Sequence, residues 1–170
     1  KIESWELALP PTIKLAYLPK AGLLRLRLTG RSSDKERLEQ DINTSVKGLY
    51  ALVGDYILGE DAESLAELVA LRMKQCSKTL SVAESCSGGA IASSITSMAG
   101  ASEYFKGGVV AYSNEVKHSI LGVQECTLGQ YGAVSEETVK EMVCGTMQKM
   151  NTDYAVATTG IAGPGGGTDE

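Results

Sequence analysis

The chain has 170 residues, of which 43% are hydrophobic and 22% are charged, a composition that excludes a disordered or collagen-like protein. Its 16 basic and 21 acidic residues give a formal net charge of −5, so no overall positive field favours nucleic acid or an anionic membrane as a partner. We expect a cytoplasmic protein, because no apolar run approaches the roughly 18 residues of a membrane span and the first residues lack the apolar core of a signal peptide.

Cysteine and histidine usage narrows the chemistry further. The four cysteines are spread along the chain without a C-x-x-C pair, so we expect reduced thiols rather than a disulfide framework. His118 is the only histidine. A single imidazole excludes sites that need two or more of them, which include most catalytic zinc centres.

The first part of the chain predicts a strand, a turn, a second strand and a helix. Residues 13–18 and 24–28 alternate between apolar and polar positions, as strands with one buried face do. Ser33 and Glu36 have the spacing of a capping box, and apolar residues then recur at helical spacing. Glycines interrupt that pattern, so we expect a small α+β domain over residues 1–60.

The remainder, residues 61–170, alternates helices with strands. In chain order the pattern predicts a helix over 65–76, a strand over 80–83, a helix over 91–98, a strand over 108–112, a short helix capped by Ser113 or Asn114 and closed at Gly122, a longer helix capped by Ser135 and a strand over 154–158. This order indicates a layered α/β domain with ligands beyond the strand ends. Because the chain stops after a glycine-rich loop, we expect this domain to be incomplete at its C-terminus.

Three segments that follow predicted strands could carry chemistry. The first is A-E-S-C-S-G-G at residues 83–89, where a hydroxyl could attack and free N–H groups could hold an oxyanion. Its serines fit ordinary helix N-caps equally well. Cys86 competes as a nucleophile, although a cysteine in such a place is more often a small buried hydrophobe. We favour serine.

The second segment runs from Tyr112 to Lys117 and again leads from a strand into a helix. Lys117 falls in the first helical turn, where the helix dipole disfavours a cation. A desolvated lysine loses its proton more easily and can serve as a general base. A solvated surface lysine is the simpler interpretation, and His118 is an alternative base. The local sequence does not choose between them.

The third segment, residues 158–167, is rich in glycine and also follows a strand. It has neither the Lys-Ser/Thr of a Walker A loop nor the spacing of a dinucleotide fingerprint. Successive backbone N–H groups in such a loop still suit a phosphate or a carboxylate. Because all three segments follow strands, an open α/β sheet could bring them together at one end.

Four runs stand out together: AESCSGG at 83–89, GGVVAYSNEVKHSILGV at 107–123, YGAVSEETV at 131–139 and TTGIAGPGGGT at 158–168. In this order and at this spacing they resemble the signature segments of the CinA family, the competence/damage-inducible proteins. The resemblance covers residues 62–170. Residues 1–61 are similar, less closely, to the connecting domain that precedes this part in longer family members.

The resemblance implies a nicotinamide-nucleotide amidase, which hydrolyses nicotinamide mononucleotide to nicotinate mononucleotide and ammonia in pyridine nucleotide salvage. The family is described as serine/lysine amidohydrolases, and its serine and lysine correspond to Ser85 and Lys117, with Tyr112 as a supporting residue. The usual family motif, AESCTGG, has threonine where this chain has Ser87, which retains a hydroxyl. The resemblance implies no metal and no organic cofactor.

In the implied mechanism Ser85 attacks the carboxamide carbon, neutral Lys117 takes the proton, and backbone N–H groups near Ser87, Gly88 and Gly89 hold the oxyanion. The expected substrate-binding residues are Ser87, Gly88, Gly89, Asn114, Thr159, Gly160, Gly163, Gly165 and Gly166. The glycine-rich loop with Thr159 is the candidate site for the 5′-phosphate. We expect a homodimer with the nucleotide as its small-molecule partner, and neither nucleic acid nor membrane as a partner.

Two other functions remain open. One is a non-catalytic nucleotide-binding or regulatory module of a larger protein, since longer family members carry an N-terminal domain that is associated with ADP-ribose hydrolysis. Such a module would tolerate the loss of Ser85 and Lys117, and both are present here. The other is an assembly domain that uses residues 1–61 as an interaction surface.

Overall fold

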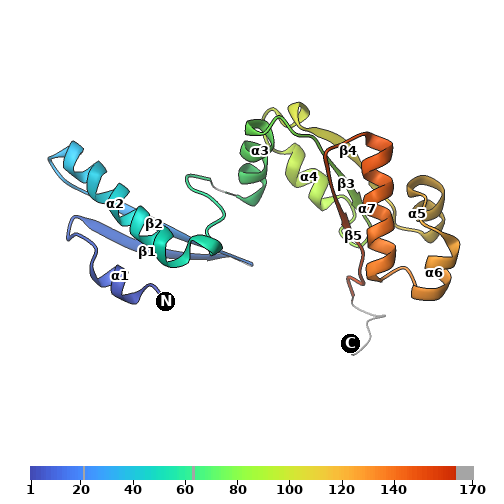
Figure 1. The fold of residues 1–170 in the computed structure, drawn as a ribbon, viewed down its shortest axis with the longest axis horizontal. Coiled ribbons are helices and arrows are strands. Elements are labelled where there is room, and N and C mark those ends of the chain that lie inside the picture. Colours follow the sequence, from blue (N-terminus) through green and yellow to red (C-terminus); the bar gives the residue numbers. More distant parts are fainter. Residues whose placement is uncertain (21, 63, 164–170) are drawn as a thin grey trace. The chain divides into compact units, whose positions relative to one another are not determined.

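The computed structural model describes residues 1–20, 22–62 and 64–163. The chain folds as two units, Lys1–Glu60 and Asp61–Glu170 (Figure 1). Each unit is built around its own sheet, one of two strands and one of three. No helix in the described ranges is long and apolar enough to cross a membrane.

The first unit is a β-hairpin packed against a long helix. Its elements are α1 (Glu3–Leu7), β1 (Ile13–Lys20), β2 (Leu23–Gly30), α2 (Lys35–Val53) and the 3₁₀ turn η1 (Gly54–Tyr56). The strands are antiparallel, with Ile13 opposite Gly30. A Cβ on Gly30 would lie 2.7 Å from Leu38 of α2, so α2 covers this face closely. The indole N–H of Trp5 donates to the Ser45 carbonyl at 2.8 Å and fastens α1 to α2.

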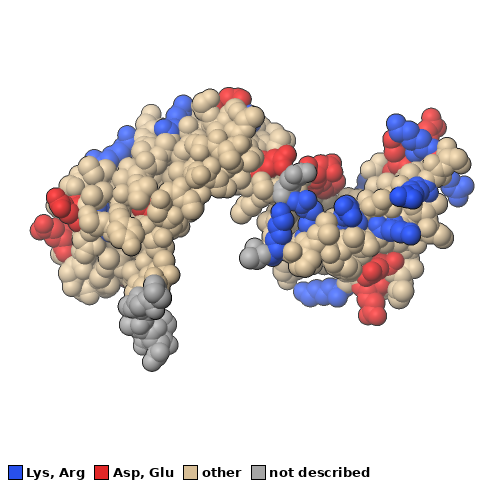
Figure 2. Space-filling model, turned by 180° about the vertical axis from the view of Figure 1, so that it is seen from behind, with Lys and Arg blue, Asp and Glu red and all other residues tan. Residues whose placement is uncertain are grey.

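The other face of the hairpin carries basic side chains. Because side chains alternate along a strand, Lys14 and Lys20 of β1 share the face away from α2 with Arg25 and Arg27 of β2. Figure 2 shows Lys and Arg side chains gathered over this unit. The hairpin thus buries one apolar face and presents a basic one, as the alternation of both strands predicts.

Two details of the first unit differ from the prediction. The N-cap of α2 is Asp34 and not Ser33, because the Asp34 carboxylate accepts from the Arg37 N–H at 3.0 Å. Helix α1 was not predicted, since five residues are too few for a helical period to show in the sequence. The two strands and the long helix are confirmed.

The second unit is a parallel sheet with helices on both faces. Its elements are α3 (Leu65–Gln75), β3 (Leu80–Glu84), α4 (Ala90–Thr96), the 3₁₀ turn η2 (Ala101–Glu103), β4 (Phe105–Val110), α5 (Asn114–Leu121), α6 (Glu125–Tyr131), α7 (Glu136–Met150) and β5 (Tyr154–Thr158). The strand order is β4–β3–β5, and both pairings are parallel, so β3 is central. The predicted layered α/β class is confirmed.

Residues of β3 point alternately to the two helical layers. Val82 packs in a cluster with Ile95 of α4, whereas Ala83 packs in a second cluster with Met142 of α7. All five residues of β3 are buried. A central parallel strand is covered on both faces, which explains its nearly continuous run of apolar and small residues. The same alternation sets the face of the sheet toward which each side chain at the end of β3 points.

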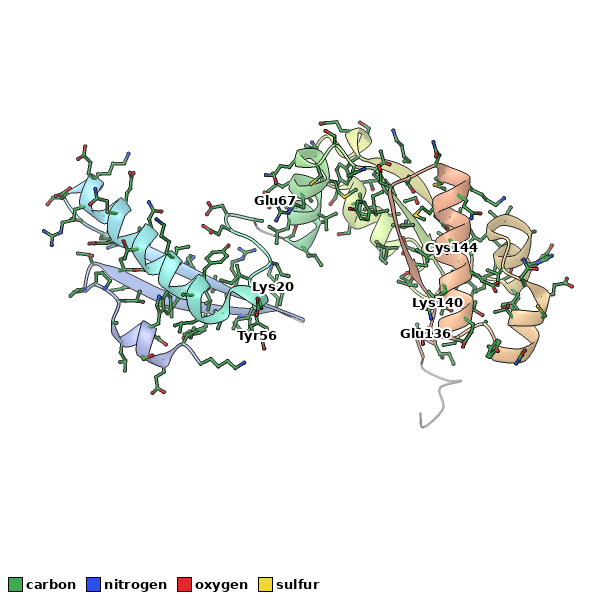
Figure 3. The ribbon with its side chains drawn as sticks, in the orientation of Figure 1. Lys20, Tyr56, Glu67, Glu136, Lys140 and Cys144 are labelled. Carbon is green, nitrogen blue, oxygen red and sulfur yellow. The ribbon has the colours of Figure 1, made fainter. Side chains whose placement is uncertain are left out.

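Helix α7 shows its polar face outward. Glu136, Lys140 and Cys144 follow one another along it at intervals of about one turn (Figure 3). Glu136 and Lys140 form an ion pair of 2.6 Å across one such turn. The inward stripe contains Thr138 and Met142, both fully buried. The outward Cys144 is an unpaired thiol, as are the other three cysteines.

Helix α5 lies very close to α7. A Cβ on Gly145 of α7 would overlap the carbonyl of Leu121 at the end of α5. Only glycine permits this approach. The contact fixes α5 against the second layer of the unit, and α5 carries Lys117.

One strand and one helix of the second unit differ from the prediction. Strand β4 begins at Phe105 and ends at Val110, not at 108 and 112, so Ala111 and Tyr112 lie in the loop after it. Helix α6 was not predicted, because its seven residues show no clear apolar period. The caps of α5, Ser113 and Gly122, and the bounds of β5 agree with the sequence pattern.

Candidate active site

A pocket of about 270 Å³ lies where the loops after β3, β4 and β5 meet. Six of the predicted site residues line it: Ser85, Tyr112, Lys117, Thr159, Gly160 and Gly163. The convergence expected from a parallel sheet therefore occurs at the carboxyl ends of its strands. A second hollow, of about 380 Å³, lies between the Gly122 region and α7, and none of the predicted site residues lines it.

Ser85 is the first residue after β3 and is held by its backbone. Its N–H donates to the Thr158 carbonyl of β5 at 3.1 Å, and its own carbonyl accepts from the Gly88 N–H at 3.1 Å. The side chain is 6% exposed and opens on the pocket. The strand pairing thus continues one residue past β3 and sets the direction of the Ser85 hydroxyl.

Glu84 precedes Ser85, and its side chain points to the other face of the sheet. Its buried carboxylate accepts from the N–H groups of Gly89 and Ile91 at 3.0 Å each and from that of Ala92 at 2.7 Å. Burial by itself raises the pKa of this carboxyl, but the hydrogen bonds from the Ala92 and Ile91 N–H groups, the Ser87 hydroxyl and the Gly89 N–H outweigh it and hold the pKa below its usual value. Glu84 is therefore ionised at neutral pH.

The start of α4 has no free N–H groups to offer a substrate. Besides the three N–H groups that Glu84 holds, those of Gly88 and Ala90 donate to the carbonyls of Ser85 and Ser87. The Gly88 and Gly89 N–H groups, which we expected to hold the oxyanion, thus already donate to acceptors within the chain. Within the described residues, Cys86 and Ser87 are the loop positions whose N–H groups have no protein acceptor.

Lys117 reaches the pocket from the first turn and a half of α5, which Ser113 caps. The residue is only 1% exposed, and its Nζ donates to Ser85 Oγ at 3.1 Å, to the Ala111 carbonyl at 2.9 Å and to the Tyr112 carbonyl at 3.2 Å. No carboxylate in the described part of the chain forms an ion pair with it. Burial lowers the pKa of the Lys117 ammonium, against a smaller opposing effect of the Cys86 thiol.

His118, the alternative base, lies elsewhere. Its ring is about half exposed, with Nδ1 at 2.7 Å from the Val123 carbonyl and Nε2 at 3.9 Å from Glu125. It does not line the pocket. Of the two candidate bases it is Lys117 that lies at 3.1 Å from Ser85 Oγ, and a neutral amine at this distance from a hydroxyl can take its proton and make the oxygen a nucleophile.

The other predicted residues fall into three groups. Tyr112 lines the pocket with a side chain that is 74% exposed, and Thr159 Oγ1 donates to the Ala133 carbonyl at 2.7 Å, which ties two walls together. Ser87, Gly88, Gly89 and Asn114 do not line the pocket. Gly165 and Gly166 lie outside the described residues.

Five lining residues were not predicted as site residues: Cys86, Ala133, Val134, Ile161 and Ala162. Cys86 was considered only as a competing nucleophile, and its Sγ would lie 3.2 Å from a Cβ on Gly160. The sequence carried one signal for the other four lining residues, because they lie within the runs that resemble the CinA family. Three His, Cys, Asp or Glu side chains placed to hold a metal ion do not occur together in the described ranges.

Comparison with known proteins places the chain among relatives of one kind. Residues 62–170 match the family model described as the CinA C-terminal domain. A CinA-like protein of Cytophaga hutchinsonii is 46% identical over 169 residues, which are 99% of this chain and 40% of that protein. A putative competence-damage inducible protein of Halothermothrix orenii is 46% identical over 92% of this chain and 38% of its own length. The chain thus spans about two fifths of these relatives.

Solved structures agree. The competence/damage inducible protein CihA from Agrobacterium tumefaciens has a TM-score of 0.61 and 42% identity, covering 62% of this chain and 64% of that one. A competence-damaged protein (CinA) superfamily protein from Escherichia coli has a TM-score of 0.61 and 30% identity, covering 66% of this chain and 69% of that one.

Proposed function

The chain belongs to the CinA family, and from this premise we propose that its Ser85 pocket hydrolyses the carboxamide of nicotinamide mononucleotide to a carboxylate and ammonia. The observation that carries the proposal is the 3.1 Å hydrogen bond between buried Lys117 Nζ and Ser85 Oγ. A lysine held among neutral acceptors, without a carboxylate, is suited to act as a neutral base.

The first half of the reaction makes an acyl-enzyme. Neutral Lys117 takes the Ser85 hydroxyl proton as Oγ attacks the carboxamide carbon, and the carbonyl oxygen becomes an oxyanion. The N–H groups of Cys86 and Ser87 are the donors that we assign to this oxyanion. Lys117 then gives its proton to the departing nitrogen, the C–N bond breaks, and ammonia leaves.

The second half restores the enzyme. Water attacks the ester carbon while Lys117 takes a proton from it, and a second tetrahedral intermediate forms. Its collapse breaks the bond to Ser85 Oγ, which recovers its proton from Lys117. The product is the nicotinate carboxylic acid, which loses its proton to ammonia or solvent, and Lys117 carries the proton in every other transfer.

The rest of the nucleotide is assigned by chemistry to the other walls. The exposed Tyr112 ring offers a flat aromatic surface against which the pyridine ring can stack. The segment from Thr159 to Gly163 offers backbone N–H groups for the phosphate. This assignment leaves the carboxamide facing Ser85.

The test is ammonia release from nicotinamide mononucleotide by the full-length protein. We expect wild type to release ammonia and Ser85→Ala to release none. Ser81→Ala is the matched control, because Ser81 is a buried serine of β3, the strand that precedes Ser85, and its hydroxyl lies 2.7 Å from that of Thr152, outside the pocket. Release by Ser85→Ala would contradict the proposal. Nucleotide binding by wild type without release would support a non-catalytic module instead.

A further inference from the structure

Glu84 and Ser85 are consecutive residues that serve opposite faces of the sheet. The Ser85 hydroxyl faces Lys117 and the pocket, whereas the Glu84 carboxylate faces α4 and does not line the pocket. We propose that Glu84 is a positioning residue, which holds the loop after β3 so that Ser85 Oγ stays within reach of Lys117 Nζ. The inference rests on the proposed function in taking Ser85 as the nucleophile.

The first support is that α4 depends on Glu84 for its cap. The N-cap position of α4 is Gly89, which has a φ of +100° and no side chain to accept a hydrogen bond. The first N–H groups of a helix need acceptors, and a negative charge there also suits the helix dipole. The 1% exposed carboxylate of Glu84 meets both needs from across the loop.

The second support is that the loop is short and closed at both ends by the same residue. Four residues, 85–88, separate Glu84 from the Gly89 N–H that it accepts. Within this loop the Ser87 hydroxyl lies 2.7 Å from the Thr158 hydroxyl of β5, and Gly88 has a φ of +60°. Strand β5 anchors the Ser85 N–H. Loss of the carboxylate would release the far end of the loop while β5 still held the near end.

A displaced hydroxyl is costly even when the fold survives. A misplacement of about 1 Å at the reacting atoms can reduce a rate by about 10²-fold. Glu84→Gln keeps the size of the side chain, but its NH₂ group would face an N–H donor in place of an acceptor oxygen. We expect kcat for ammonia release to fall by about 10²-fold, with KM nearly unchanged, because Glu84 does not touch the pocket.

Chemical labelling separates this inference from the identity of the substrate. A small sulfonyl fluoride sulfonylates the oxygen of an activated serine, with loss of fluoride, whatever the natural substrate is, and intact-protein mass with peptide mapping reports the rate at Ser85. We expect this rate to fall in Glu84→Gln by the same factor as kcat. If wild type releases no ammonia but labels at Ser85, and Glu84→Gln labels more slowly, the proposed function fails and this inference stands.

Asp153→Asn is the matched control. Asp153 also accepts from a backbone N–H and a hydroxyl, both of Thr79 and both at 2.8 Å, but at the opposite end of β3. We expect Asp153→Asn to label at the wild-type rate. Equal labelling of Glu84→Gln and wild type, or no labelling of Ser85 in wild type, would overturn the inference.

A second variant, Glu84→Asp, keeps the inference testable if Glu84→Gln does not fold. It keeps the negative charge on a shorter side chain, so we expect it to retain part of the α4 cap and to label at an intermediate rate. Circular dichroism and thermal unfolding check that each variant is folded before its rate is read. Should Glu84→Gln not fold, wild-type labelling by a folded Glu84→Asp would overturn the inference, and slowed labelling would support it.

Discussion

The two ends of the three-stranded sheet use a lysine and a carboxylate in opposite ways. At the amino end, Lys78 Nζ lies 2.8 Å from Asp153 Oδ1, and this hydrogen bond raises the pKa of Lys78 and lowers that of Asp153. At the carboxyl end, Lys117 contacts three uncharged oxygens and its pKa is lowered by burial. The carboxylate of that end, Glu84, is occupied by N–H groups on the far face.

The comparison shows how position decides reactivity for the same residue types. A lysine beside a carboxylate is stabilised in its charged form and contributes to structure. A buried lysine without such a partner is stabilised in its neutral form, which has a lone pair for a proton. Because Glu84 and Lys117 lie on opposite faces of the sheet, the same strand end has both a structural anion and a candidate base.

The largest expected effect is the loss of the Lys117 amine, and the same substitution at Lys78 is its control. Lys117→Met keeps the apolar length of the side chain but removes the amine, and we expect ammonia release to fall by about 10²–10⁴-fold, the usual contribution of a general base. Nucleotide binding should stay within about tenfold of wild type, or about 1.4 kcal/mol. Lys78→Met should release ammonia near the wild-type rate. Steady-state kinetics and nucleotide titration measure both, and turnover by Lys117→Met would remove this lysine as the base.

A second variant, Cys86→Asp, would place a carboxylate beside the lysine at the carboxyl end of the sheet, as Asp153 lies beside Lys78 at the amino end. Cys86 lines the pocket and acts electrostatically on Lys117, so Cys86→Asp would place a carboxylate nearby. An opposite charge at close range raises a lysine pKa by about 1–3 units, and we expect the pH–rate profile to move to higher pH. Cys86→Ser is the control: it adds no carboxylate and removes the small raising effect of Cys86 on the pKa of Lys117, so its profile should not move to higher pH. An unmoved Cys86→Asp profile would contradict the assignment of Lys117 as the titrating group.

The pH dependence of wild type tests the lowered pKa directly. Protonated Lys117 cannot accept the Ser85 proton, so kcat/KM should rise with pH through the folded-state pKa of Lys117, which lies below 10.5. Because the unfolded chain keeps its proton to higher pH, burial of Lys117 costs stability most below the folded pKa, and the cost declines as pH rises above it. Rates that rise only at or above 10.5 would show that the pKa is not lowered.

The smallest effect is expected at the amino end. Asp153→Asn removes an exposed ion pair, which is worth little to stability, and the urea midpoint should fall slightly at neutral pH. The pKa of Asp153 is below its unfolded value of 3.8, so its contribution is complete above that pH and is lost as pH falls through the folded pKa. The deficit of Asp153→Asn should therefore shrink in acid. A deficit independent of pH would show that the charge of Asp153 does not stabilise the fold.

Local signals were enough for most elements. Alternation predicted both strands of the hairpin, and the caps of α5 and α7 were visible as Ser113 and Ser135 because a cap involves residues only three apart. Short elements were missed, since α6 has too few residues to show a period. Ser33 was predicted as the cap of α2 from its capping-box spacing with Glu36, but the adjacent Asp34 is the cap, and both residue types are good caps.

By itself the sequence determined which loops follow strands and which family the chain resembles, and the match to the CinA C-terminal domain confirms that resemblance. Only the tertiary structure showed that Lys117 and not His118 lines the pocket, because neighbouring helical residues point about 100° apart and the packing of α5 on α7 turns one of them inward. The structure also decided that Glu84, and not a substrate, takes the N–H groups of α4. Glu84 and these N–H groups come together only when the loop between them folds, and a local sequence pattern does not predict such a contact.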